Sequence, residues 1–475
     1  MIELIFILPL MTGVMALVLP ANLGRILLVA TALLHLQLTV MSWMGKLTPV
    51  FPNFFSASPE GLLILLVTSF IFVCISIYSF SYMNETNMEH KPAFSCCMLL
   101  FLGTMSMVTL SDHPIVLWIA IEATTLVSAP LIFIHRSKEA LEATWKYILI
   151  CSVGIALALL GCFFIVLAMD LGNISGPLTF SALNSVATQL DPVWLKAGFI
   201  FIVIGFGTKM GLAPMHTWLP DAHSQAPSPA SALLSGALLN CAFLGIYKVH
   251  VLMNIAGLGD FSGNVLIGFG LASMFVGAIF IIGQPDYKRM LAYSSIKNMG
   301  IIAFGVGVGG FALYGAFLHL IHHSLLKSSL FLSAGNILLG FGSKQVQRIG
   351  GVIRLLPKTF VSLFAGFIGI SGLPPFGTFI SEIIIIIGAF QSRRYISIGL
   401  FIFALTLVFA GAGRIFMSMS FGDSTATIRV KEKTLRLLPT YALLLASIVL
   451  CIWMPDVIYT TIINTIKAIG GGIHG

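Results

Sequence analysis

The chain has 475 residues, of which 58% are hydrophobic and only 9% are charged, and its mean hydropathy is +1.02. Soluble domains are about 25% charged, so the composition excludes a large soluble core. The net charge of +8 does not indicate a nucleic-acid partner, because the basic residues fall between apolar segments.

Apolar runs bounded by proline, glycine and charge predict about fourteen membrane-spanning helices in a lipid bilayer. The runs are continuous over about 20 residues, whereas the strands of a membrane barrel alternate over about 10. In chain order the predicted helix cores are 2–20, 25–44, 61–80, 93–110, 113–134, 146–169, 193–218, 228–253, 263–283, 289–308, 311–340, 355–389, 395–420 and 436–466. The first is expected to be an uncleaved helix, because it lacks a basic start and a small-residue cleavage site.

The basic residues are divided unequally between the two ends of these helices. Connections after odd-numbered helices hold fifteen of them: Arg25, Lys91, Arg136, Lys138, Lys146, Lys288, Arg289, Lys344, Arg348, Arg354, Lys358, Arg429, Lys431, Lys433 and Arg436. Connections at the other end hold five: Lys46, Lys196, Arg393, Arg394 and Lys467. Since basic residues favour the cytoplasmic side, we expect both termini to lie outside a bacterial or archaeal cytoplasmic membrane.

Two predicted helices are interrupted by the same kind of sequence, GFGTKMGLAPMHTWLPDA at 205–222 and GFIGISGLPPFGTFISEI at 366–383. Each has Gly-Leu followed by proline near its middle. Proline removes a backbone donor and clashes with the preceding turn, so each helix should break there. Freed backbone groups are tolerated at this depth only where they are buried in protein or line a wet cavity, and paired interruptions are typical of a transport path. Two unrelated proline kinks are the alternative.

The interruptions fall in the seventh and twelfth predicted helices, and an offset of five reverses the direction across the membrane. We therefore predict an all-α polytopic membrane protein with two inverted five-helix repeats and two proline-broken helices. The predicted division is 1–90 for helices 1–3, 91–253 for the first repeat, 262–420 for the second repeat and 433–475 for the C-terminal helix.

Few charged residues lie inside the predicted helices. An isolated charge there costs at least ~2.5–3.5 kcal/mol, so such charges are usually functional. Glu122 lies in the middle of VLWIAIEATTLVSAP, Lys209 shortly precedes the first break, and Glu382 follows the second. Glu122 and Lys209 are natural ion-pair partners, since each would lower the other's burial cost. The pair is either a switch that opens and closes or a static pair that only fixes packing.

The stretch HLIHHSLLKSSLF at 319–331 places His319, His323 and Lys327 at i, i+4 and i+8. They share one helix face at about 6 Å spacing, which suits a chain bridged by water. Histidine exchanges protons near neutral pH, and a desolvated lysine can do the same. His322 lies off this face and is the member best suited to a structural role. Metal binding by two of the histidines and a structural role for all four groups are the alternatives.

Four further residues are weaker candidates. Lys248 closes its helix and can reach the surface with its long side chain, and Lys297 lies within the tenth helix. Asp221 and His223, in LPDAHSQAPSP, lie at the inner mouth of the first broken helix and either control entry or cap the next helix. The seven cysteines have no spacing suited to a cluster or haem, so we expect no cofactor, no metal and no catalytic site.

The strings TKMGLAPMHTWLPDAHSQAPSPASALLSG, HLIHHSLLKSSLFLSAGN and GLPPFGTFISE resemble the antiporter-like subunits of respiratory complex I, Mrp-type cation/proton antiporters and group 4 membrane-bound hydrogenases. The similarity runs from about residue 90 to 420. Within this family WIAIEATTL and HRSKEALEATWKYILICSVGIALALLG are most similar to the hydrogenase-4 component F type. The resemblance implies fourteen helices and a central hydrated axis in the membrane plane.

The resemblance also implies roles for individual residues. Glu122 and Lys209 match the family's glutamate–lysine pair, and Glu382 matches the exit residue of the twelfth helix. The proton-transfer residues of the eleventh helix correspond to His319, His323 and Lys327. The eighth helix departs from the pattern, because Ser235 and Asn240 stand where several relatives carry a lysine or histidine. Lys297 matches no family role.

The sequence therefore predicts a proton-translocating membrane subunit of a redox-driven complex, hydrogenase-4-like or related to complex I. Its partners would be other membrane and soluble subunits, which would carry the electrons, and its ion would be H⁺, with Na⁺ as the alternative. Two other functions remain open: a subunit of an Mrp-type Na⁺/H⁺ antiporter, or the membrane subunit of an ion- or bicarbonate-uptake complex.

Overall fold

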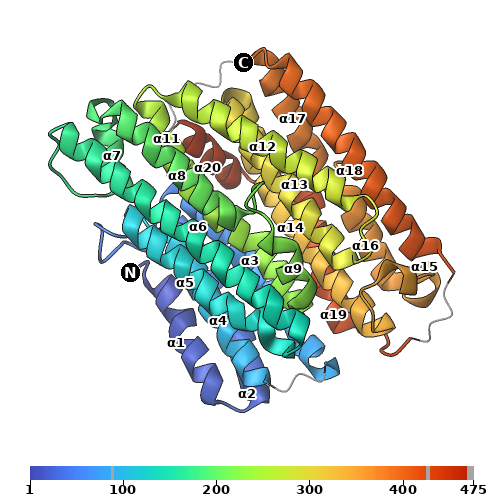
Figure 1. Ribbon diagram of the computed structural model, residues 1–475. Helices are drawn as coiled ribbons and strands as arrows, with labels where there is room; N and C mark the ends of the chain where they lie inside the picture. Colours follow the sequence, from blue (N-terminus) through green and yellow to red (C-terminus); the bar gives the residue numbers. More distant parts are fainter. Residues whose placement is uncertain (87–89, 424–427, 468–475) are drawn as a thin grey trace.

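The computed structural model describes residues 1–86, 90–423 and 428–467, and in these residues the regular elements are helices (Figure 1). Twelve of the described helical segments are long and apolar enough to cross a membrane, and three shorter apolar helices accompany them. The prediction of an all-α polytopic membrane protein is confirmed.

The chain starts with six helices that follow one another closely. They are α1 (Leu4–Val18), α2 (Ala21–Trp43), α3 (Pro59–Glu85), α4 (Lys91–Leu110), α5 (Pro114–Ile132) and α6 (Lys138–Leu171). The polar connection after α6 contains the short helix α7 (Phe180–Ser185). Serine side chains cap the start of two of these helices. Ser58 accepts a hydrogen bond from the first turn of α3, and Ser137 accepts one from the first turn of α6.

The seventh predicted helix is two helices, α8 (Pro192–Met210) and α9 (Trp218–Gln225). The eighth predicted helix is continuous from Ser228 to Ile255, but its helix type changes along its length. It consists of α10 (Ser228–Leu233), a π-helical turn (Leu234–Leu238) and α11 (Leu239–Ile255). Extra-wide turns of this kind occur frequently at functional sites.

The second half begins with three long helices, α12 (Gly259–Ile281), α13 (Tyr287–Val308) and α14 (Gly310–Phe341). After the short α15 (Val352–Leu355), the twelfth predicted helix is divided into α16 (Pro357–Ile370) and α17 (Gly377–Gln391), and α18 (Tyr395–Phe421) follows. Helix α14 contacts α3, α13, α16, α17 and the later helix α19 (Thr434–Ile452), and its side chains are almost all buried, so it lies at the centre of the bundle.

The last predicted helix, 436–466, is wrong as a single helix. The structure has α19 (Thr434–Ile452) and α20 (Asp456–Lys467), separated by Trp453, Met454 and Pro455. A proline cannot continue the hydrogen bonding of the helix before it, so the chain breaks there. Residues 468–475 of the predicted C-terminal segment lie outside the described residues.

Both predicted breaks are confirmed. Gly211 directly follows α8 and Gly372 closely follows α16, and these glycines have φ values of 83° and 70°, in the left-handed region that favours glycine. Neighbouring side chains satisfy backbone groups near the first break. The amide of Ala213 donates to Ser273 Oγ at 2.9 Å, and the indole of Trp218 donates to the carbonyl of Thr208 at 2.8 Å.

Helices α6 and α8 approach closely along a row of small residues. A Cβ added at Gly205 would lie 2.5 Å from the backbone nitrogen of Ala158, and one added at Gly198 would lie 3.1 Å from the carbonyl oxygen of Gly161. Small residues at such crossings let the two backbones come together inside a membrane. This crossing holds Lys209, in the last turn of α8, against α5 and α6.

We expect Gly205→Leu to destabilise the protein by about 1–3 kcal/mol or more, because the new side chain must push α6 and α8 apart. The melting temperature of the purified protein in detergent measures the effect. Gly268→Leu on α12 is the matched control, since a Cβ at Gly268 meets no atom within 4 Å. Equal melting temperatures for the two variants would contradict the close packing.

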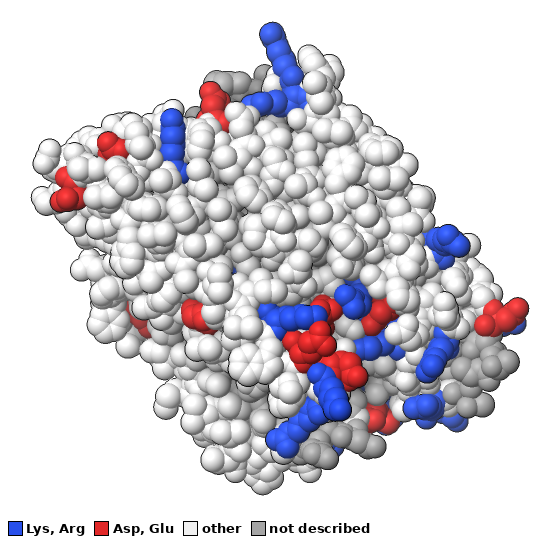
Figure 2. Space-filling view, in the orientation of Figure 1, with Lys and Arg blue, Asp and Glu red and all other residues white. Residues whose placement is uncertain are grey.

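The charged side chains are gathered at the ends of the bundle. Figure 2 shows that most of those visible on this face lie at its lower end, around α9 and α15, with few in the band above. The scarcity of charged side chains in this band is expected for a surface that faces lipid, where a charge is costly.

Candidate functional site

Glu122 on α5 and Lys209 on α8 are brought together, but through a third residue. The ammonium of Lys209 donates to Thr125 Oγ1 at 2.8 Å, and Thr125 in turn donates to the Glu122 carboxylate at 3.3 Å. Lys209 is fully buried, whereas Glu122 is partly exposed and also accepts from Ser152 at 2.7 Å. Glu122 and Lys209 are therefore connected through the Thr125 hydroxyl, which lies between the two charges.

Aromatic side chains complete the surroundings of Lys209. Its Nζ lies 2.5 Å from the hydroxyl of Tyr147 and 4.5 Å from the centre of that ring, and the ring of Trp218 lies at 5.9 Å. The hydroxyls and the ring faces offset part of the cost of burying the ammonium. Sequence reasoning missed both Thr125 and Tyr147. The position of Thr125, one helix turn after Glu122, was the signal that could have found it.

The eighth span continues the polar row toward the centre. Asn240 donates to Ser324 Oγ on α14 at 2.7 Å, and Ser235 shares a hydrogen bond of 2.8 Å with Ser295 on α13. All four side chains are fully buried. Ser235 and Asn240 thus make polar contacts with α13 and α14, which carry Lys297 and the histidines His319 and His323.

The histidine row of α14 lies as predicted on one face. The ring centres of His319 and His323 are 6.5 Å apart, too far for a direct hydrogen bond. His319 bonds Ser381 at 2.8 Å and Asn298 at 3.0 Å, whereas neither ring nitrogen of His323 has a hydrogen-bond partner among the described residues. Buried polar groups in proteins are nearly always hydrogen-bonded, so we expect water beside His323.

Two neighbours of His323 on α14 have different surroundings. Lys327 is fully buried and donates to the backbone carbonyl of Leu291 at 2.6 Å. His322 points to the opposite side and shares a hydrogen bond of 2.9 Å with Ser447 on α19. The sequence predicts Lys327 on the same face as His323 and His322 away from it, and the structure has the same arrangement.

Glu382 on α17 pairs with Lys297 on α13. The two charged atoms are 3.6 Å apart, and Lys297 also donates to the carbonyl of Ile370 at 3.4 Å. Sequence reasoning named both residues separately and did not predict their contact. No signal in the sequence connects them, because they are far apart in the chain and on helices that do not follow each other.

At the charged end of the bundle, Asp221 forms ion pairs and does not cap the helix that follows. It lies 3.2 Å from Lys146 and 3.0 Å from Arg289. His223 on α9 is fully buried and stacks on Phe331 of α14 with 4.7 Å between ring centres. It therefore extends the histidine row of α14 toward this end.

Lys344 lies beside this cluster, outside the membrane spans. It is within 4.0 Å of the Asp286 carboxylate and donates to Ser224 Oγ at 2.9 Å. Burial lowers the pKa of Lys344, and Asp286 partly offsets that effect. The cluster thus holds several charges of both signs close to His223.

Lys248 does not extend to the surface. It is 4% exposed, donates to the carbonyl of Ser111 at 2.8 Å and lies 3.8 Å from the Glu60 carboxylate. Lys248 and Glu60 line a cavity of about 360 Å³ that also borders Asp112.

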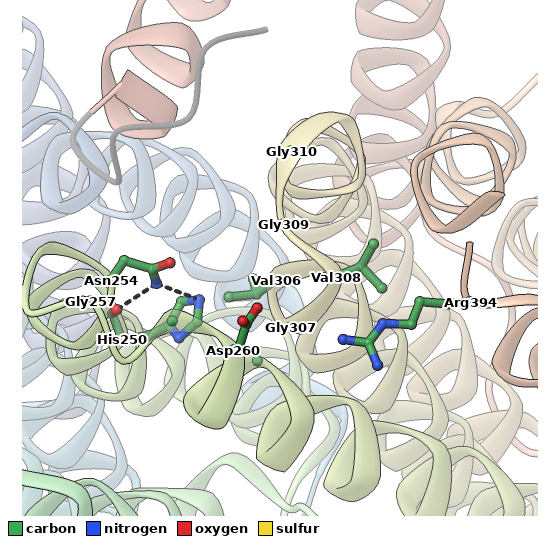
Figure 3. Close-up of a pocket in the computed structure, with 12 residues that line it drawn as sticks. His250, Asn254, Gly257, Asp260, Val306, Gly307, Val308, Gly309, Gly310 and Arg394 are labelled. Atoms are coloured by element: carbon green, nitrogen blue, oxygen red, sulfur yellow. Dashed lines mark hydrogen bonds between the residues drawn. The ribbon is translucent and has the colours of Figure 1, made fainter. Parts of the chain in front are cut away.

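A second cavity, of about 440 Å³, opens at the end of α13 (Figure 3). Its lining includes His250, Asn254, Asp260 and Arg394, with the glycine-rich junction of α13 and α14 between them. The residues predicted for proton transfer are not among those that line it. In the described part of the chain, no group of three or more His, Cys, Asp or Glu side chains is placed to hold a metal ion.

The fold and these buried groups define the class of the protein: a multi-pass membrane protein whose interior carries a row of protonatable side chains. Residues 111–409 match the family of NADH:quinone oxidoreductase and Mrp antiporter transmembrane subunits, and the chain belongs to that family.

Individual relatives agree with this assignment. The chain is 36% identical over 372 residues to a hydrogenase-4 component F homolog of Methylacidiphilum infernorum, covering 75% of this chain and 78% of that one. It is 33% identical to a Na(+)/H(+) antiporter subunit of Alkalihalophilus pseudofirmus, covering 68% of this chain but only 41% of the relative. A chain of respiratory complex I from Thermus thermophilus has the same fold, with a TM-score of 0.85, 19% identity and coverage of 99% and 100%.

Proposed function

We propose that this chain is the proton-translocating membrane subunit of a redox-driven complex, hydrogenase-4-like or related to complex I. The observation that carries the proposal is the row of buried protonatable and polar side chains between Glu122 and Glu382. The similarity to a hydrogenase-4 component F homolog supports the type of complex. Electron carriers would belong to soluble partner subunits.

The first step takes place at Glu122, Thr125 and Lys209. The carboxylate stabilises the buried ammonium through Thr125. If a change in a partner subunit withdraws Glu122, Lys209 is left as a buried charge with less compensation, and such a charge tends to lose its proton. Moving Glu122 therefore releases a proton from Lys209 toward the centre of the bundle.

The proton then crosses to α14. The hydrogen bond between Asn240 and Ser324 joins the eighth span to α14 one residue from His323. Water beside His323 would connect this contact to Lys327 and to His319. From His319, the hydroxyl of Ser381 leads to the neighbouring Glu382 on α17. The central link thus works through amide, hydroxyl and water where several relatives have an ionisable residue.

The basic end of the bundle would face the cytoplasm, which places both termini outside. Protons would enter beside Asp221 and His223, because this buried histidine lies between the charged cluster and the α14 row. They would leave from Glu382 on the other side. The transported ion in this proposal is H⁺.

We expect Lys209→Ala to reduce proton pumping to about one hundredth, since a positioned proton-transfer group contributes about 10²–10⁴-fold to its step. The measurement is acidification or alkalinisation of proteoliposomes that hold the complex purified through a tag on this chain, with its own electron donor. Lys138→Ala, which removes an exposed lysine at the start of α6, is the control. Unchanged pumping by the Lys209 variant would refute the proposal.

A second candidate function, as part of an Mrp-type Na⁺/H⁺ antiporter, is favoured by the 33% identity to the antiporter protein of Alkalihalophilus pseudofirmus. It predicts proton movement that is driven by a Na⁺ gradient and needs no electron donor. Replacing Na⁺ by choline in the same proteoliposomes distinguishes the two functions.

A further inference from the structure

Two pairs of opposite charge occupy corresponding helices of the two halves of the bundle. In the first half, the acid Glu122 is on the fifth span and the base Lys209 on the seventh. In the second half, the base Lys297 is on the tenth span and the acid Glu382 on the twelfth, where they form an ion pair of 3.6 Å. Each broken span therefore carries one member of a pair. This member is the base Lys209 in the first half and the acid Glu382 in the second, so the positions of acid and base are exchanged between the halves.

The second pair is built into closely fitted surroundings. Lys297 is 1% exposed and the Glu382 side chain 8%. The Glu382 carboxylate lies against the backbone of Gly372 at the helix break, in space that the Cβ of any other residue would occupy. Removing one partner of a buried pair leaves the other charge uncompensated, which is strongly unfavourable.

His319 is joined to both members of this pair through their neighbours in sequence. One ring nitrogen bonds Asn298, the residue after Lys297, and the other bonds Ser381, the residue before Glu382. The ring thus spans α13 and α17 at the level of the ion pair. A change in the separation of these helices alters the hydrogen bonds of His319, and a change in the proton on His319 acts on both helices.

We propose that Lys297 is the positioning residue for Glu382 and that the two form a second ion pair that opens and closes. Because the acid and the base are exchanged relative to the first pair, this second pair makes proton transfer directional. The proposal rests on the function proposed above. With the pair closed, Lys297 neutralises the carboxylate. With the pair open, Glu382 presents a negative charge to the histidine row.

The direction follows from elementary electrostatics. A proton on His323 or Lys327 is attracted by the carboxylate at the second break. Once Lys209 has taken up a new proton, its ammonium at the first break also repels the proton on the row, and both interactions are stronger in the buried interior than in water. If the second break carried a lysine and its partner a carboxylate, the two ends would both repel the proton when open. The reversed order therefore favours transfer from α8 toward α17.

The test exchanges the two charges in the complete complex. Lys297→Glu combined with Glu382→Lys restores an ion pair but reverses its order, whereas Lys297→Gln removes the pair and Lys297→Arg keeps it. Proton pumping in proteoliposomes and the melting temperature are measured for each. We expect the exchanged variant to melt near the wild-type temperature and to pump about tenfold less or worse, and the arginine variant to pump normally.

The alternatives give different results. A pair that only fixes packing predicts that the exchanged variant regains pumping together with stability, and that result would overturn the inference. Melting of the exchanged variant as low as that of Lys297→Gln would also overturn it, because the two side chains would then not act as an ion pair. Lys209→Ala in the same assay tests the proposed function separately: if it stops pumping while the exchanged variant pumps normally, only the present inference fails.

Discussion

Replacing Lys327 by methionine is expected to abolish proton pumping by the complex while the protein stays folded. Lys327 lies at the centre of the row, is fully buried, and within the described residues makes one hydrogen bond, to the carbonyl of Leu291 at 2.6 Å. Methionine fills similar space without a charge, so the packing around Phe331 is kept. Because no other basic group of α14 follows His323 on this face, pumping should fall to about one hundredth or less.

The control for this prediction is Lys358→Met, which removes an exposed lysine at the start of α16. Electron transfer by the complex is measured together with pumping. Loss of pumping with electron transfer still detectable is the expected pattern, since the redox centres would be in other subunits. If the Lys327 variant pumped at half the wild-type rate or faster, Lys327 would be a structural residue, and the protons would have to follow a route that does not include it.

Features that depend on local sequence could be predicted for this fold. Glycine followed closely by proline favours a helix break, so both interruptions were predictable, and the spacing of His319, His323 and Lys327 indicated their common face. The last helix was predicted too long because the apolar residues on both sides of Pro455 and Asp456 were joined into one run. The proline and the charged residue beside it mark the position where the chain breaks.

The exact partners of the charged groups on distant helices could not be predicted. Thr125 between Glu122 and Lys209, and Lys297 beside Glu382, depend on how far α5, α8, α13 and α17 are rotated about their axes. Rotation is set by packing of small residues such as Gly205 against Ala158. The sequence shows which residues are charged and at what depth, but their partners are decided by this packing.

The adjacent histidines of α14 offer the sharpest remaining test of the row. His323 faces the centre with no hydrogen-bond partner among the described residues, while His322 bonds Ser447 on α19 and packs against Gly377. We expect His323→Leu to reduce pumping to about one hundredth, because the connection between Asn240 and Lys327 loses its proton acceptor. We expect His322→Leu to lower the melting temperature, through the unpaired Ser447 hydroxyl, and to leave pumping largely intact.

The two variants differ by one position and by the same change in side chain, so insertion, expression and loss of a buried histidine are matched between them. Pumping per assembled complex, with the melting temperature beside it, separates the two effects. Equal loss of pumping in both variants would mean that α14 carries protons on two faces, or that its packing alone limits the rate. If His322→Leu lost proton pumping while His323→Leu pumped normally, the proton route would run along the α19 side of α14. That result would contradict the role proposed for Asn240 and Ser324.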